Sequence, residues 1–148
     1  MAMSETYVFD AEPLIAYCYD EPGADRVESL LTGVYDGDAT GLMSEVTATE
    51  VTYKIAWLET DGRPTADDLA TGRTQVRDIV DGGCKLRPTT ESWETAARVK
   101  AGGGIALGDA FAVALADAAG ATLVVGADDD FADLPVSIRI ERIRDEPA

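Results

Sequence analysis

The stretch Tyr7–Val8–Phe9–Asp10 is a short apolar run that ends on an acidic residue. Aromatic and β-branched residues of this kind are typical of a buried strand, and Pro13 is well placed at the first position of a following helix. A second apolar run, Thr122–Val125, ends in the same way, before the acidic residues 128–130. Because helical segments lie between the two runs, we predict two parallel strands in an α/β sheet.

The ends of these two strands carry the first candidates for a functional site. In open α/β sheets, ligands bind beyond the carboxyl ends of the strands. Asp10 and Asp128 are expected at that edge of the sheet. The alternative is that both are ordinary loop aspartates in a chain rich in them. The hypothesis therefore depends on further acids that converge on the same edge.

Length and composition indicate one domain without a membrane span. The chain has 148 residues, of which 46% are hydrophobic, and contains no apolar run long enough to cross a bilayer. Residues 1–6 lack the basic and apolar regions of a signal peptide, so we expect a cytoplasmic protein. Cys18 and Cys84 are too few for a disulfide framework and lack a metal-ligand spacing. Cys18 lies among apolar residues, which favours a core thiol.

The chain contains no histidine. This absence excludes Ser–His–Asp and Cys–His catalysis, His-based cleavage of RNA and nearly all zinc enzymes. Any catalysis must use carboxylates, hydroxyls, Lys, Arg or a hard metal ion. Carboxylate oxygens suit Mg²⁺ and Mn²⁺, so carboxylates with such a metal are the leading possibility.

The net charge is −16, and arginine outnumbers lysine nine to three. A surface this acidic repels itself and repels phosphate backbones in dilute buffer. The acids are dispersed along the chain and do not form a tail. We interpret this composition as halophilic, that is, as adaptation to molar salt, where the Debye length is about 3 Å and such repulsion is screened.

A long helix is predicted from an N-cap at Ser44 to about Thr60. Its apolar residues form two faces, Val46, Tyr53 and Trp57 on one and Val51, Ile55 and Leu58 on the other. Glu50 lies within the first face, which indicates that its side chain points inward. A glutamate is rarely buried without a partner, and the alternative is a surface pair with Lys54.

A second core helix is predicted over residues 105–119, which are apolar on every side except for Asp109 and Asp117. Asp109 lies in its first turn, where free N–H groups and the helix dipole favour an anion. The remaining predicted elements are a helix over 24–34, a strand over 40–43, a helix opened by a Thr65–Asp68 capping box, a strand over 84–86, a helix capped by Thr90 with Trp93, Ala96 and Ala97 inward, and an edge strand over 136–140.

Asp10, Glu50, Asp109 and Asp128 thus each occupy a position where burial or a strand end is predicted. Carboxylates gathered in one cleft repel one another and lose hydration, which raises their pKa values and destabilises the fold. A divalent cation reverses that penalty. Metal-assisted hydrolysis of a phosphodiester is the reaction that such a set suits best, and it needs no histidine.

The same segments resemble those of PIN-domain proteins, of the kind found as the ribonuclease toxin in VapBC toxin–antitoxin pairs. The resemblance extends from Tyr7 to about Ile143. Its motifs are Val8–Ala16 around Asp10, Ala48–Lys54 around Glu50, Gly108–Asp109–Ala110 and Asp128–Asp129–Asp130–Phe131.

The resemblance implies a parallel sheet flanked by helices, an acidic Mg²⁺ or Mn²⁺ site, an RNA substrate, a cognate antitoxin and a homodimer. Carried over by motif, Asp10, Glu50, Asp109 and Asp128 form the acidic quartet, with Asp130 as a further candidate. Two positions depart from the family pattern. Glu12 stands where a Ser, Thr or Asn is usual, and Gly126 stands where a Thr or Ser is usual.

The two lost hydroxyl groups would have oriented ligands or waters around the metal. They leave a second hypothesis open, in which a PIN-like module binds RNA or a protein without cutting. A third, a purely structural halophilic domain, leaves the inward Glu50 and Asp109 unexplained.

Overall fold

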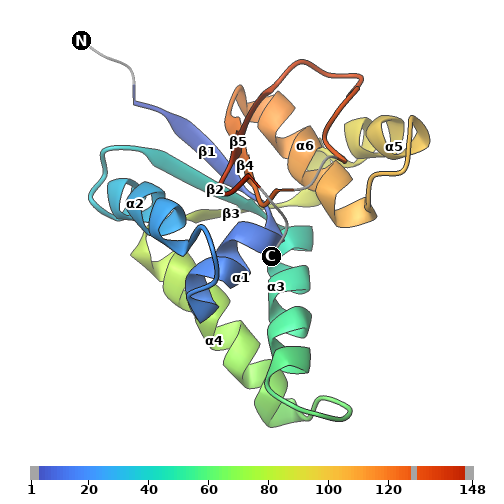
Figure 1. Cartoon of the computed structure of the whole chain (residues 1–148). Helices are drawn as coiled ribbons and strands as arrows, with labels where there is room; N and C mark the ends of the chain where they lie inside the picture. Colours follow the sequence, from blue (N-terminus) through green and yellow to red (C-terminus); the bar gives the residue numbers. More distant parts are fainter. Residues whose placement is uncertain (1–3, 128–129, 146–148) are drawn as a thin grey trace.

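The computed structural model describes residues 4–127 and 130–145. Its centre is a five-stranded sheet with the order β3-β2-β1-β4-β5, in which every neighbouring pair is parallel (Figure 1). The strands are β1 (Thr6–Phe9), β2 (Thr40–Ser44), β3 (Lys85–Arg87), β4 (Thr122–Val125) and β5 (Arg139–Arg142). The predicted parallel α/β sheet is confirmed.

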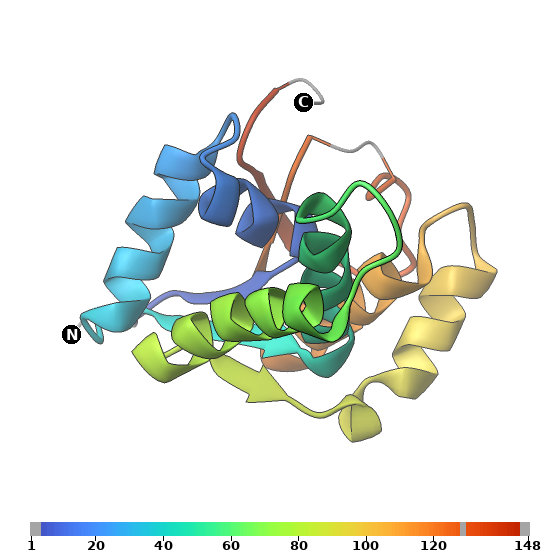
Figure 2. The same cartoon turned by 90° about the horizontal axis from the view of Figure 1, so that it is seen from below.

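Helices cover both faces of this sheet (Figures 1 and 2). The α-helices of the described residues are α1 (Ala11–Tyr19), α2 (Ala24–Tyr35), α3 (Glu45–Leu58), α4 (Ala66–Gly82), α5 (Trp93–Ala101) and α6 (Leu107–Ala119). One core cluster consists of side chains from the four helices α1, α2, α3 and α4, packed against Phe9, Met43 and Val124 of the sheet. The other joins α5 and α6 with Val8, Leu42 and Leu123. Successive side chains of a strand point to opposite faces of the sheet, and each cluster takes those of one face. Both faces of the central strands are therefore buried.

The long helix α3 begins where the sequence indicates. The Ser44 hydroxyl accepts a hydrogen bond from the Val46 N–H, as expected of an N-cap. α4 opens with the predicted capping box, in which Thr65 and Asp68 satisfy one another's backbone N–H groups. α3 and α4 pack against one another. The loop that joins them lies at the end of α3 that points away from the sheet (Figure 1).

Some predicted details are wrong. α1 begins at Ala11, with Asp10 as its N-cap, so Pro13 is in the first turn but is not the first helical residue. α5 begins after Ser92 rather than after Thr90, because a short 3₁₀ turn (Thr89–Glu91) comes first. Of the residues predicted to face inward on α5, only Ala96 is buried, while Trp93 and Ala97 are exposed.

The second half of α3 is also less covered than the pattern predicts. Trp57 and Leu58 are more than half exposed, while Val51 and Ile55 are fully buried. The last strand begins at Arg139 rather than Val136, because its pairing with β4 starts at Thr122. No helix of the described residues is both long and apolar enough to cross a membrane.

Candidate active site

Asp10 lies at the carboxyl end of the central strand β1. Its backbone N–H donates to the Val124 carbonyl at 3.0 Å, which ties it to the neighbouring strand β4. The side chain is buried, with 4% of the residue exposed. The Oδ1 atom has no hydrogen-bond partner among the described residues. A buried carboxyl oxygen without a partner is costly unless a proton or a cation compensates for it.

Asp109 lies in the first turn of α6, a helix that covers the opposite face of the sheet from α1. Its carboxyl group lies close enough to that of Asp10 to change the pKa of Asp10. Burial raises the pKa of Asp10 well above its usual value, and the charge and hydrogen bond of Asp109 raise it further. A hydrogen bond to the Ala11 N–H opposes this shift, and the charge of Glu50 adds to it.

Glu50 points from α3 toward the start of α6. Its carboxyl group lies so close to Gly108 that a Cβ atom at that position would overlap it. Because Gly108 has no side chain, Glu50 and Asp109 can approach one another. Glu50 Oε1 is buried and has no hydrogen-bond partner among the described residues.

The other oxygen of Glu50, Oε2, lies 3.2 Å from the Lys54 ammonium. Burial disfavours the charge of Lys54, but its hydrogen bond to Glu50 and the carboxylate charge raise the Lys54 pKa overall. Glu50 is thus both inward, with 14% of its side chain exposed, and paired with Lys54. The two alternatives for this residue are both realised.

Three of the four acids named from the sequence are therefore placed at one edge of the sheet. Asp128 lies outside the described residues, and Asp130 is exposed. No three acids of the described residues are grouped closely enough to hold a metal ion as their side chains stand. The donor chemistry nevertheless fits a hard cation, because Asp10 and Glu50 each present a buried carboxyl oxygen without a hydrogen-bond partner there.

Sequence reasoning missed a basic residue beside this edge. Arg144 follows β5, only 8% of its side chain is exposed, and it forms an ion pair with Glu12. Its Nη1 atom also donates to the Pro22 carbonyl at 2.9 Å. The Glu12 carboxyl group in turn occupies the space that a side chain at Gly126 would need. The predicted last strand could have revealed Arg144, because a strand parallel to β4 ends at the same edge of the sheet as Asp10.

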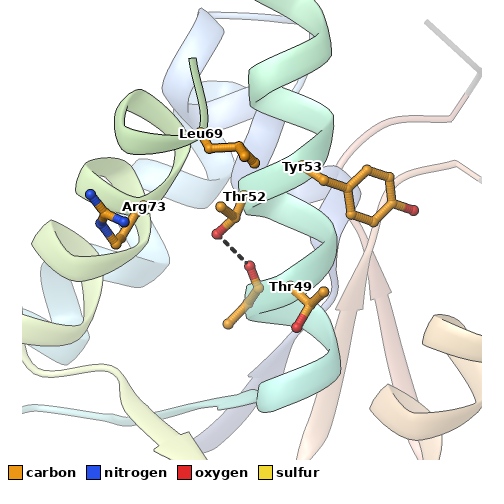
Figure 3. A pocket seen from close by; sticks show the side chains of 6 residues that line it. Thr49, Thr52, Tyr53, Leu69 and Arg73 are labelled. Atoms are coloured by element: carbon orange, nitrogen blue, oxygen red, sulfur yellow. Dashed lines mark hydrogen bonds between the residues drawn. The ribbon is translucent and has the colours of Figure 1, made fainter. Parts of the chain in front are cut away.

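A separate pocket of about 460 Å³ lies between α3 and α4 (Figure 3). It is lined by Ala48, Thr49, Thr52, Tyr53, Leu69 and Arg73 rather than by the acids. The Thr52 hydroxyl donates to the Ala48 carbonyl at 2.8 Å, so its hydrogen is already used in a bond within α3. The wall of the pocket is therefore mainly apolar, with one arginine.

Several solved structures share this fold. VapBC2 from Rickettsia felis, bound to a promoter DNA fragment, has a TM-score of 0.67 at 15% identity and covers 93% of this chain and 98% of that one. DNA-bound VapBC from Salmonella typhimurium has a TM-score of 0.65 at 15% identity, with 96% and 100% covered. VapBC-5 from Mycobacterium tuberculosis, of a family of toxin–antitoxin systems, has a TM-score of 0.56 at 20% identity, with 93% and 98% covered. These likenesses concern the fold.

At the level of sequence, no curated protein matches the chain. A protein family does. Residues 7–136 match the PIN domain, and the match spans β1 to β4 together with Asp10, Glu50 and Asp109. The chain therefore belongs to the PIN domain family.

Proposed function

We propose that this protein is a metal-dependent endoribonuclease that hydrolyses RNA phosphodiester bonds. The observation that carries the proposal is the contact between the buried Asp10 and Asp109, which would be unfavourable if both were ionised without a cation. PIN domains are generally nucleases, and they usually use divalent metals. The absence of histidine is compatible with this chemistry, because a metal site of carboxylates needs none.

Asp10, Glu50, Asp109 and Asp128 are the residues that would hold Mg²⁺ or Mn²⁺. A bound divalent cation would lower the pKa of water and neutralise charge on a phosphodiester. The chain itself supplies positioning. The hydrogen bond of the Asp10 N–H to Val124 fixes the first acid on the sheet, and Lys54 holds one oxygen of Glu50 while the other faces the start of α6.

We further propose that the enzyme is the toxin of a toxin–antitoxin pair and forms a homodimer. Three of the solved structures with this fold are described as VapBC or toxin–antitoxin complexes bound to DNA or to their partner. The chain also exposes large apolar side chains near its pocket. Trp57 stacks edge-on against Tyr53 with ring centroids 4.9 Å apart, and Tyr53 and Leu69 line the pocket. Such a surface favours a protein partner.

The test is an RNA cleavage assay with Mn²⁺, Mg²⁺ or EDTA in high KCl. The parent protein should cleave with either metal and not with EDTA, and Asp10→Asn or Asp109→Asn should reduce the rate at least about 100-fold. Asp117→Asn is the matched control, because Asp117 is an exposed acid on the same helix as Asp109. If the parent binds RNA with metal but does not cut it, the non-cleaving module becomes the correct description.

A further inference from the structure

The two departures from the family pattern meet in space. Glu12 is the second residue of α1, directly after the turn that carries Asp10, and Gly126 directly follows β4. The residues are far apart in the sequence, yet a Cβ atom at position 126 would overlap the Glu12 carboxyl group. The acid at one position therefore requires the absence of a side chain at the other.

Space, rather than backbone conformation, imposes this requirement. The backbone of Gly126 does not adopt the positive φ angles that favour glycine, in contrast to Gly23 or Gly120. Gly126 is buried, and the three atoms nearest to a Cβ atom at this position all belong to the Glu12 carboxyl group. If Glu12 were small, a Thr or Ser at position 126 would be acceptable to the backbone.

Arg144 holds Glu12 in this place. β5 runs parallel to β4, with Arg142 opposite Val125, and the Ile143 N–H donates to the Val125 carbonyl at 3.0 Å. This pairing brings Arg144 beside Gly126. From there its guanidinium contacts Glu12 on α1 and the Pro22 carbonyl in the turn before α2.

In the Arg144–Glu12 pair the guanidinium is buried, while 44% of the Glu12 side chain is exposed. Only 8% of the Arg144 side chain is exposed, whereas Arg139 of β5 is 74% exposed and pairs with Glu5 at 3.3 Å. An exposed pair of that kind contributes little. The buried guanidinium of Arg144 contacts both α1 and the turn before α2, so loss of Glu12 would leave its charge without a carboxylate partner.

We propose that Glu12 and Arg144 form a positioning unit for the acidic site, with Gly126 as the space it requires. The unit replaces the two hydroxyl residues expected at positions 12 and 126. It orients the start of α1, which follows Asp10, against Gly126 and Ala127, which follow β4. Neither residue is assigned a contact with the reacting atoms. The inference rests on the proposed function, because it takes the acidic site as the object that is positioned.

The experiment is a double-mutant cycle with Gly126→Thr, Glu12→Ser and the two combined. Mn²⁺ binding is measured by calorimetry and thermal stability is measured without metal, so neither readout needs catalysis. We expect Gly126→Thr alone to weaken Mn²⁺ binding about 10–100-fold, as changes around metal ligands do. In the Glu12→Ser background, Gly126→Thr should cause little further loss of Mn²⁺ affinity, because the overlap with the Glu12 carboxyl group is gone. Equal losses from Gly126→Thr in both backgrounds would overturn the inference.

Arg144, which follows β5, is tested against Arg139, which begins that strand. Arg144→Met should weaken Mn²⁺ binding about 10-fold at a temperature where the variant is folded, and Arg144→Lys should recover part of the loss. Arg139→Met should leave Mn²⁺ binding unchanged, and equal effects of Arg144→Met and Arg139→Met would remove the positioning role.

The failures of the two proposals can be told apart. A parent that binds Mn²⁺ and shows the coupling but cuts no RNA overturns only the proposed function. A parent that cuts RNA while the cycle is additive overturns only this inference. A parent that binds no Mn²⁺ overturns both.

Discussion

The carboxyl group of Asp109 lies beside that of Asp10, although Asp10 follows the central strand β1 and Asp109 belongs to α6. Burial and the neighbouring charge of Asp109 both raise the pKa of Asp10, because they disfavour its ionised form. Without metal, the site therefore holds a proton at a pH where an isolated aspartate would be ionised. A divalent cation would compete with that proton for the same oxygens.

Asp10→Asn should stabilise the metal-free protein in a pH-dependent way. The pKa of Asp10 is raised on folding, so the folded state binds its proton more tightly and ionisation of Asp10 opposes folding. The gain from the substitution should be absent below the ordinary value of 3.8, grow as the pH rises above it, and level off above the raised pKa. Chemical denaturation in EDTA between about pH 4 and about pH 8 measures it. Asp117→Asn is measured in parallel as the control for loss of an exposed charge on α6, and a gain from Asp10→Asn that is constant with pH would contradict the assignment.

Gly108→Ala should impair the site more than the fold. A methyl group there would overlap the Glu50 carboxyl group, which must move away from the start of α6. We expect Mn²⁺ affinity and RNA cleavage to fall at least about 10-fold. Gly104→Ala is the control, because a Cβ atom there has nothing within 4 Å. If Gly108→Ala retains the metal affinity of Gly104→Ala, Glu50 does not act at this position.

RNA binding should depend on divalent metal and only weakly on KCl. Phosphate affinity normally comes from Lys and Arg and falls steeply with salt through counterion release. This chain has 12 such residues against 28 acids, so we expect metal at the acidic site to supply much of the attraction. Binding is measured with the Asp109→Asn variant and, since that change also weakens metal binding, with the parent in Ca²⁺. Tight binding in EDTA with a steep salt slope would instead indicate a basic surface.

Thermal stability should rise with salt. A net charge of −16 creates repulsion that is unscreened in dilute buffer. The melting temperature should increase between about 0.1 M and about 3 M KCl, since the Debye length falls several-fold over that range. A parallel titration with a neutral osmolyte separates screening from a general effect of the solution. A flat or falling curve in KCl would remove the halophilic interpretation.

The sequence was informative wherever one local rule decides the structure. Apolar runs that end on acids predicted β1 and β4, and the Ser44 and Thr65 caps predicted the starts of α3 and α4. Local patterns placed Asp10 after a strand and Asp109 in the first turn of a core helix, and the family resemblance assigned both to one acidic site.

Features set by the packing of distant segments could not be obtained in this way. Trp57 and Trp93 satisfy a helical apolar pattern, yet the neighbouring elements leave them more than half exposed. The contact of Arg144 with Glu12 depends on the register of β5 against β4, and periodicity does not specify register between strands so far apart. The requirement for Gly126 likewise depends on where the Glu12 carboxyl group comes to lie.

The position of Arg144 has a practical consequence for anyone who produces this protein. A fusion partner joined close after Arg144 would crowd a side chain that contacts Glu12 and Pro22. An N-terminal fusion would instead lead into the start of β1, at the end of that strand opposite to Asp10 (Figure 1). Metal affinities and cleavage rates are therefore best compared on protein that is purified through its N-terminus.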